Sequence, residues 1–166
     1  SIVGLPSSGL HTNGYSLARK VFFDIGGYSV KDKISELESS IGLTLLKPHI
    51  NYTNHLFSTI DAGIDIHGIA HVTGGGIIEN LPRILPDGCA ASIQKGSWPV
   101  LDVFNAIQSI GGVSEDEMFR AFNMGIGMIF IINKKDVSAV SSALSDTSPI
   151  FKIGEIVAGN GEVEIG

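Results

Sequence analysis

Apolar residues recur along the chain with two periodicities, which divide it into predicted strands and helices. Short, nearly continuous apolar runs predict strands at residues 1–5, 64–72, 89–93, 128–132, 150–158 and 162–165. Apolar positions three and four residues apart predict helices at residues 15–22, 51–61, 77–84, 99–110, 114–122 and 136–144. Because strands and helices alternate without a strict order, the pattern predicts an α+β fold in which helices pack against a mixed sheet.

Local signals predict how these elements begin, end and pack. Asn13 or Ser16 is expected to cap the first helix, and Ser114 with Glu117 has the spacing of a capping box. A polar helical turn is expected at residues 32–38. The inner side of the 51–61 helix is expected to carry Leu56, Phe57 and Ile60.

Two strand predictions concern burial and pairing. The run at residues 128–132 is almost wholly apolar, which is typical of a strand buried on both faces. The last two strands are separated by Gly159-Asn160-Gly161, which predicts a closing β-hairpin.

The stretch IAHVTGGGIIENLPRILP, residues 69–86, joins a strand to a short helix through three glycines. Glycines let a ligand approach the backbone, and the first N–H groups of a helix have no partner within it, so such a turn can bind anions. Asn80 and Arg83 follow closely and offer an amide and a guanidinium. A tight turn without a ligand is the alternative, since glycine turns are common in loops.

The loop that follows the first predicted strand repeats this design of a strand, small polar residues and a helix start, and a third polar loop leads from a predicted helix into the strand at residues 128–132. Each loop lies at a junction of predicted elements, where open sheets place their ligands. The candidate residues are Ser7, Ser8, Gly9, His11 and Asn13; His71, Thr73, Gly74, Gly75, Gly76, Asn80 and Arg83; and Asn123 and Gly125.

Histidine in such loops is a candidate proton carrier at neutral pH, and a structural loop histidine is the alternative. The other three histidines, His49, His55 and His67, lie outside these loops and are expected to be structural. The sequence has no zinc-site spacing, P-loop, dinucleotide fingerprint or nucleophile elbow, so we expect no protein-only metal site and no covalent catalysis.

Composition narrows the classes of partner. Charged residues make up 17% of the chain, against about 25% usually, which suggests an apolar interface to another chain or domain. The chain starts at Ser1 without an initiator methionine, so we expect a fragment of something larger. With a net charge of −6, no basic stripe and no apolar run of about 20 residues, neither nucleic acid nor a membrane is an expected partner. The single cysteine, Cys89, fits a reducing compartment, and we expect the cytoplasm.

Four stretches carry a resemblance to a known enzyme family: GLPSSGLHTNGYSLARKVF, IAHVTGGGIIENLPRILP, FNMGIGM and KIGEI. In this order they resemble the C-terminal half of aminoimidazole ribonucleotide synthetases, the phosphoribosylformylglycinamidine cyclo-ligases of purine biosynthesis. The resemblance covers residues 1–158. It implies a three-layer fold, with helices on both faces of the mixed sheet, and a single C-terminal domain at residues 1–166.

The resemblance also implies an activity, which is the ATP-dependent closure of formylglycinamidine ribonucleotide to aminoimidazole ribonucleotide, ADP and phosphate. ATP and magnesium would be bound mainly by an N-terminal domain absent from this chain, through which the full-length enzyme would form a homodimer. His11 and His71 would handle protons or hold the formyl oxygen. Ser7, Ser8, Arg83 and the glycine turn would bind phosphate, and Asn13, Asn80 and Asn123 would orient the substrate.

Two alternatives remain at this stage. The first is another enzyme of the superfamily, such as formylglycinamidine synthetase, selenophosphate synthetase, thiamine-phosphate kinase or the hydrogenase-maturation dehydratase. The second is a non-catalytic phosphate-binding module. The SSGLHTNGYSLAR stretch favours the cyclo-ligase.

Overall fold

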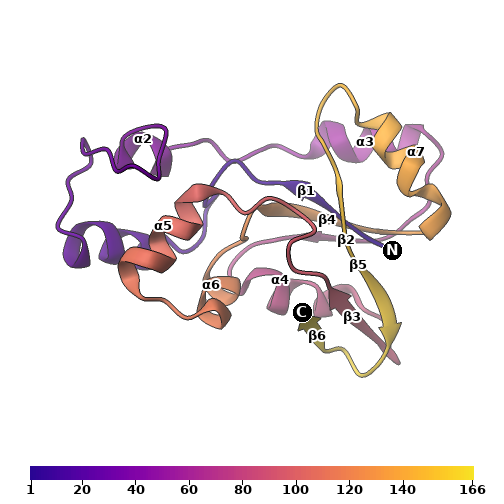
Figure 1. Cartoon of the computed structure of the whole chain (residues 1–166). Coiled ribbons are helices and arrows are strands. Elements are labelled where there is room, and N and C mark those ends of the chain that lie inside the picture. Colours follow the sequence, from indigo (N-terminus) through magenta and orange to yellow (C-terminus); the bar gives the residue numbers. More distant parts are fainter.

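A computed structural model describes residues 1–166 and contains one mixed sheet of six strands. The strands are β1 (Ile2–Pro6), β2 (Ile66–His71), β3 (Cys89–Ile93), β4 (Ile126–Ile132), β5 (Phe151–Ala158) and β6 (Val163–Ile165). Their order across the sheet is β2-β4-β1-β5-β3-β6 (Figure 1). Every neighbouring pair is antiparallel except β3 with β6.

Strand β4 is buried along nearly its whole length, as its apolar sequence predicts. Side chains alternate between the two faces of a strand. Ile129 and Ile131 therefore join a large core on one face, whereas Phe130 and Ile132 join a smaller core on the other. Both faces of the sheet must be covered as a result.

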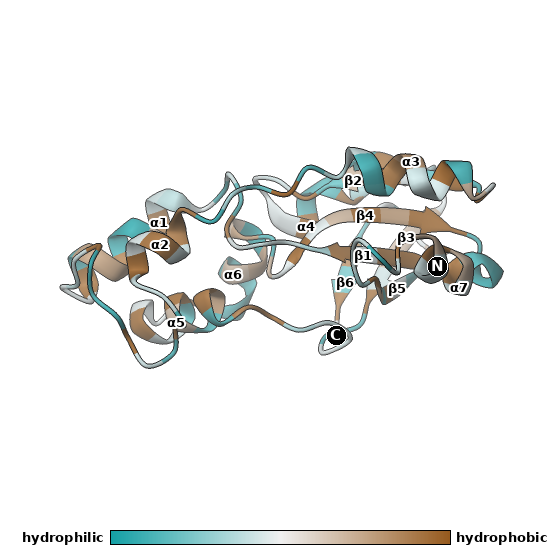
Figure 2. Ribbon diagram, turned by 90° about the horizontal axis from the view of Figure 1, so that it is seen from above, coloured by the Kyte–Doolittle hydropathy of each residue, from teal (hydrophilic) through white to brown (hydrophobic).

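Helices pack on both faces of the sheet, which confirms the predicted α+β fold. Helices α3 (Thr53–Asp61) and α7 (Val137–Ala143) lie over the face with the smaller core (Figures 1 and 2). Helices α4 (Gly76–Asn80) and α6 (Glu115–Ala121) pack on the opposite face.

The remaining helices extend beyond the sheet and make the molecule elongated (Figure 2). They are α1 (Tyr15–Arg19), α2 (Ile41–Leu45) and α5 (Asp102–Gly111). Helix α1 continues as a π-helical segment, Lys20–Ile25, whose buried Val21 and Phe22 join α5 in the large core. Short 3-10 helices follow α4 at Pro82–Ile84 and β4 at Lys134–Asp136.

The predicted closing hairpin is wrong. Strand β3 lies between β5 and β6 and pairs in parallel with β6. The turn donates the N–H of Gly159 to the Gly88 carbonyl and that of Gly161 to Cys89. The turn therefore wraps around the start of β3, and a tight turn signal alone did not reveal the strand inserted between its arms.

Three local predictions are also corrected. Phe57 and Ile60 are 56% and 48% exposed, because α3 turns Leu56 and the fully buried Thr59 inward instead. Residues 32–38 form turns and no helix. Gly14, with φ at 74°, occupies the N-cap position of α1 in place of Asn13 or Ser16. The Ser114 cap of α6 is confirmed, because its hydroxyl accepts the Glu117 N–H at 3.4 Å.

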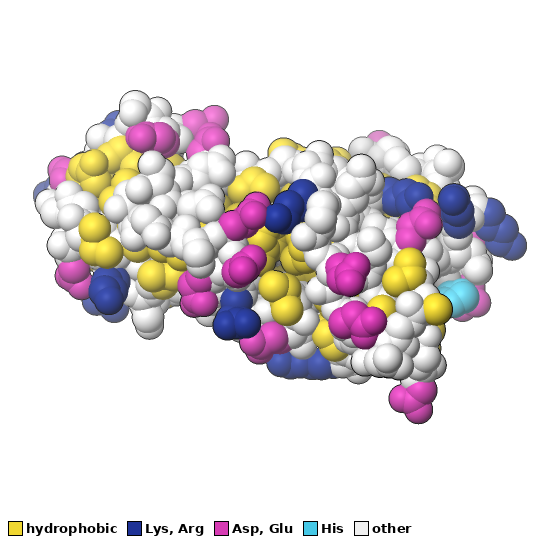
Figure 3. All heavy atoms as spheres, turned by 60° about the horizontal axis from the view of Figure 1, so that its bottom comes forward, with side chains coloured by type: hydrophobic (Ala, Val, Ile, Leu, Met, Phe, Trp, Pro, Cys, Tyr) yellow, Lys and Arg dark blue, Asp and Glu magenta, His cyan; other side chains and the backbone are white.

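Two observations concern the helices and the charged surface. None of the helices combines the length and apolarity that a membrane crossing requires. On the face in Figure 3, lysine and arginine side chains lie beside acidic ones, without a continuous basic surface.

The glycine turn before α4 packs closely against α6, which generates a stability prediction. A Cβ on Gly76 would overlap the Phe119 carbonyl oxygen, and φ there is 60°. Gly88 also has positive φ, at 80°, but open space around it. We expect Gly88→Ala to cost about 1 kcal/mol of unfolding free energy from backbone strain. Gly76→Ala should cost about 2 kcal/mol more from overlap. Denaturant unfolding measures both, and equal losses would contradict the close packing.

Candidate functional site

The three predicted loops meet at one end of the sheet. Strand β1 ends where β4 begins, with Pro6 opposite Ile126, and β2 ends with His71 opposite Met128. Because these three strands are adjacent and antiparallel, the loops at 7–14, 72–76 and 123–125 share one edge. The fold therefore brings the three candidate loops to one edge of the sheet.

Asn123 joins two of these loops through a fully buried amide. Its Nδ2 donates to the carbonyls of Gly9 and Leu10 at 2.9 and 3.2 Å. Its Oδ1 accepts the Ser7 hydroxyl at 2.8 Å and the Gly125 N–H at 2.9 Å. The Ser7 N–H also donates to the Gly125 carbonyl at 2.8 Å. Asn123 thus cross-links the backbone of the two loops.

Asn80 holds the glycine turn in the same way. Its Nδ2 donates to the carbonyls of Thr73, Gly74 and Gly76 at 2.7–3.3 Å. Its Oδ1 accepts the Thr73 hydroxyl at 2.9 Å. The Asn80 amide and the Thr73 hydroxyl therefore form their hydrogen bonds within the turn.

The start of α4 has fewer free backbone N–H groups for an anion than the sequence suggested. Helix α4 has only five residues, and the Gly76 N–H already donates to the Thr73 carbonyl at 3.0 Å. Gly74 remains exposed and open, with Asn13 as the side chain nearest to it. The Asn13 Nδ2 is buried and has no hydrogen-bond partner in the chain, so this amide can serve a ligand.

Three histidines gather beside the glycine turn. The His11 and His49 rings stack with centroids 4.0 Å apart, and the Nε2 atoms of His49 and His71 are 2.9 Å apart. Tyr52 lies against the cluster and donates its hydroxyl to the Pro6 carbonyl at 2.6 Å. His49 was expected to be structural, and no spacing rule relates it to His11 and His71; only the fold brings the three together.

Close approach of His11 and Tyr52 to β4 requires glycine at position 127. A Cβ there would overlap the Tyr52 hydroxyl and would lie 2.7 Å from the Cε1 of His11. An open cavity of about 290 Å³ adjoins the cluster, between the residues before α3 and the β2–β4 edge. His49, Tyr52 and His71 line it, so a ligand in this cavity would contact them.

Desolvation lowers the pKa of both predicted histidines, so both rings are neutral at pH 7. Desolvation, with smaller contributions from His49 and His71, lowers the pKa of His11 to about 4. Desolvation and then His49 also lower the pKa of His71. The Nε2 of His11 accepts the Ser8 N–H at 3.1 Å, so the proton of the neutral ring resides on Nδ1.

The cluster has the composition of a metal site, and each of the three histidines offers one nitrogen within 4.8 Å of the others. A ligating nitrogen needs a free lone pair. The Nε2 lone pair of His11 accepts the Ser8 N–H, and its Nδ1, which carries the proton of the neutral ring, is buried without a hydrogen-bond partner. The arrangement therefore suits proton handling by His49 and His71 better than coordination by all three rings.

Two other predicted site residues, Ser8 and Arg83, differ in how near they lie to the histidine cluster and the glycine turn. The Ser8 hydroxyl donates to the Pro48 carbonyl at 2.5 Å, which ties the first loop to the segment before His49. Arg83 is exposed beside Ile84, which packs near Gly68 in the middle of β2. Because α4 and the following 3-10 helix run back along β2, the structure does not bring Arg83 to the glycine turn.

Comparison with known proteins identifies the family of this chain. A family described as "AIR synthase related protein, C-terminal domain" matches residues 1–166. The chain belongs to this family. It is 47% identical, over 98% of its length, to a phosphoribosylformylglycinamidine cyclo-ligase from Caldanaerobacter subterraneus. A cyclo-ligase from Geotalea daltonii is 47% identical over 93% of the chain. The chain spans 48% and 44% of these relatives, about half of their length.

Solved structures support the fold of this AIR synthase related domain. Thiamine-monophosphate kinase from Stenotrophomonas maltophilia superposes with a TM-score of 0.62 at 19% identity, over 99% of this chain and 49% of that one. The E. coli hydrogenase maturation protein HypE gives 0.60 at 17% identity, over 99% and 45%. At such low identity the likeness concerns the fold alone.

The Asn123 cross-link of the AIR synthase related domain should contribute strongly to stability. We expect Asn123→Ala to lower the unfolding free energy by about 3 kcal/mol, because it leaves buried backbone groups without partners. Asn133→Ala, at the other end of β4, loses one contact of 3.3 Å to His67 and should change stability by about 0.5 kcal/mol or less. Urea unfolding compares the two, and similar losses would refute a special role for Asn123.

The low pKa of His11 generates a pH prediction. Its folded pKa, about 4, lies below the ordinary 6.5, so the unfolded chain binds more protons between these values. Stability from this group is complete above pH 6.5 and is lost as the pH falls towards 4. His11→Asn keeps a residue that tolerates φ of 59° and should flatten this dependence, with His71 accounting for the remainder. An unchanged slope in pH-dependent unfolding would contradict the burial of a neutral His11.

Proposed function

We propose that this chain is the C-terminal domain of an ATP-dependent cyclo-ligase. The full-length protein would convert formylglycinamidine ribonucleotide to aminoimidazole ribonucleotide, ADP and phosphate. The observation that carries the proposal is 47% identity to phosphoribosylformylglycinamidine cyclo-ligases across nearly the whole chain. The three site loops fall within the aligned length and meet at one edge of the sheet.

The proposal assigns nucleotide binding to a part of the full-length protein outside this chain, which spans about half of its relatives. ATP and magnesium would bind mainly to an N-terminal domain, which would also form the homodimer in the cytoplasm. ATP binding by the fold has a parallel in a hydrogenase maturation protein HypE solved in complex with ATP, with a TM-score of 0.54. In the reaction, ATP would phosphorylate the formyl oxygen, the amidine nitrogen would attack the formyl carbon, and phosphate would leave.

The histidine cluster provides the proton acceptor for that attack. His71 is neutral at pH 7, exposed to the cavity, and paired with His49 at 2.9 Å, so it can take a proton from the amidine nitrogen and share it. His11 is buried and bound to the Ser8 N–H, which makes it a positioning residue beneath His49. We therefore assign proton transfer to His71 and His49.

The loops provide contacts for the rest of the substrate. The exposed Gly74 and the unpartnered Asn13 amide are the available groups at the glycine turn. Ser7, Ser8, Thr73 and Gly125 would shape the loops that hold this surface, because their hydrogen bonds are made within the chain. Arg83 is left out of the proposed site.

Two other functions are distinguished by assay. The likeness to thiamine-monophosphate kinase and HypE leaves a different reaction of the superfamily as one alternative. A non-catalytic phosphate-binding module is the other. Incubation of the full-length protein with formylglycinamidine ribonucleotide and ATP should yield aminoimidazole ribonucleotide. Formation of another superfamily product from its own substrate, or no turnover of any of them, would overturn the cyclo-ligase proposal.

Substitution of His71 tests its assigned role. In the full-length protein, we expect His71→Asn to lower turnover roughly 10- to 1000-fold, the usual range for a general base. His67→Asn is the matched control, because His67 is exposed on the same strand and interacts with Asp65 and Asn133 instead. Steady-state kinetics with saturating substrate compares them. Unchanged turnover in His71→Asn would remove this residue from the mechanism.

A further inference from the structure

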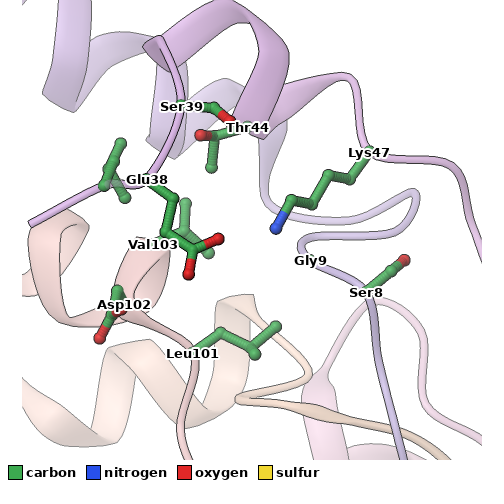
Figure 4. Close-up of a pocket in the computed structure, with 10 residues that line it drawn as sticks. Ser8, Gly9, Glu38, Ser39, Thr44, Lys47, Leu101, Asp102 and Val103 are labelled. Carbon is green, nitrogen blue, oxygen red and sulfur yellow. The ribbon is translucent and has the colours of Figure 1, made fainter. Parts of the chain in front are cut away.

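A second cavity adjoins the first loop and shares no lining residue with the cavity beside the histidine cluster. It has a volume of about 140 Å³ and lies between Ser8–Gly9, residues 37–47 and the start of α5. In Figure 4, the Lys47 ammonium and the Glu38 carboxylate point towards one another across this cavity. Neither group takes part in any of the chain's five ion pairs, so both are available to a ligand.

Two short connections link this cavity to the histidine cluster. Ser8 lines the cavity and donates its N–H to His11 at 3.1 Å. Lys47 lines the cavity, and His49 follows two residues later. Two residues of extended chain span about 7 Å. At this spacing, a molecule the size of a ribonucleotide is long enough to extend from the cavity to His49.

The chemistry of the cavity selects a particular kind of group. Glu38 and Asp102 oppose the single ammonium of Lys47, so the lining is unfavourable for a phosphate dianion. A carboxylate accepts hydrogen bonds and an ammonium donates them, and a vicinal diol both donates and accepts. The nearly buried Leu37, Thr44 and Val103 form a largely apolar floor, which suits the carbon face of a sugar ring.

We propose that this cavity binds the ribose ring of the substrate, with Glu38 accepting from a ring hydroxyl and Lys47 donating to one. This inference rests on the proposed function for the identity of the ligand. The phosphate then lies outside the cavity, and the base-forming end of the molecule extends over Ser8–Gly9 towards His49 and His71. Glu38 and Lys47 select a hydroxylated sugar and take no part in proton transfer.

The test is a calorimetric titration of the chain with ribose 5-phosphate and, separately, with inorganic phosphate. Ribose 5-phosphate should bind roughly 10-fold or more tightly than inorganic phosphate, because only the sugar hydroxyls can form hydrogen bonds with both Glu38 and Lys47. Glu38→Gln and Lys47→Met should each remove most of this difference. Glu36→Gln and Lys33→Met change exposed charges in the same segment outside the cavity, and they should retain the difference.

Each other outcome overturns the inference. Equal affinity for the two probes, no binding of ribose 5-phosphate, or a preference that survives in both cavity variants would show that no sugar is recognised here. Circular dichroism confirms that each variant is folded. Because no turnover is measured, failure of the cyclo-ligase assay leaves a positive result intact, and a negative result leaves that assay unaffected.

Discussion

The buried amide of Asn123 is the interaction on which the rest of the site depends. With four hydrogen bonds it fixes the path of the chain as it leaves β1 and as it enters β4. Those two loops place His11 against His49 in the histidine cluster and Gly9 beside the second cavity. Because the bonds lie within the protein, the loops are ordered before any ligand binds, which lowers the entropic cost of binding.

Close packing then determines the chemistry of the histidines. Gly127 lets Tyr52 and His11 approach the sheet, and the resulting burial keeps His11 neutral. His49 and His71 remain partly accessible at the cavity beside it. The same sheet edge therefore provides a buried ring that orients the cluster and two accessible rings that can exchange a proton.

The sequence predicted most helices, strands and candidate loops of this domain. It was less informative about which strands pair and which distant side chains come into contact. The runs that became β1 and β4 are strongly apolar, and β2 carries Ile66, Ile69 and Ala70, so these three strands could be found from the sequence. The insertion of β3 between β5 and β6 depends on contacts distant in the chain, which a local turn signal does not contain. His49 was missed for the same reason. Arg83 follows the glycine turn closely in sequence, but the chain after α4 runs along β2 and carries Arg83 away from the turn.

The measurement that bears most directly on this arrangement is an NMR titration of the histidine imidazole nitrogens in the chain. The structure predicts that His11 stays neutral down to about pH 4 with its proton on Nδ1, since Nε2 accepts the Ser8 N–H. His71 should also titrate below its ordinary pKa. If His11 titrated near 6.5, or carried its proton on Nε2, the packed cluster at the end of β1, β2 and β4 would be contradicted.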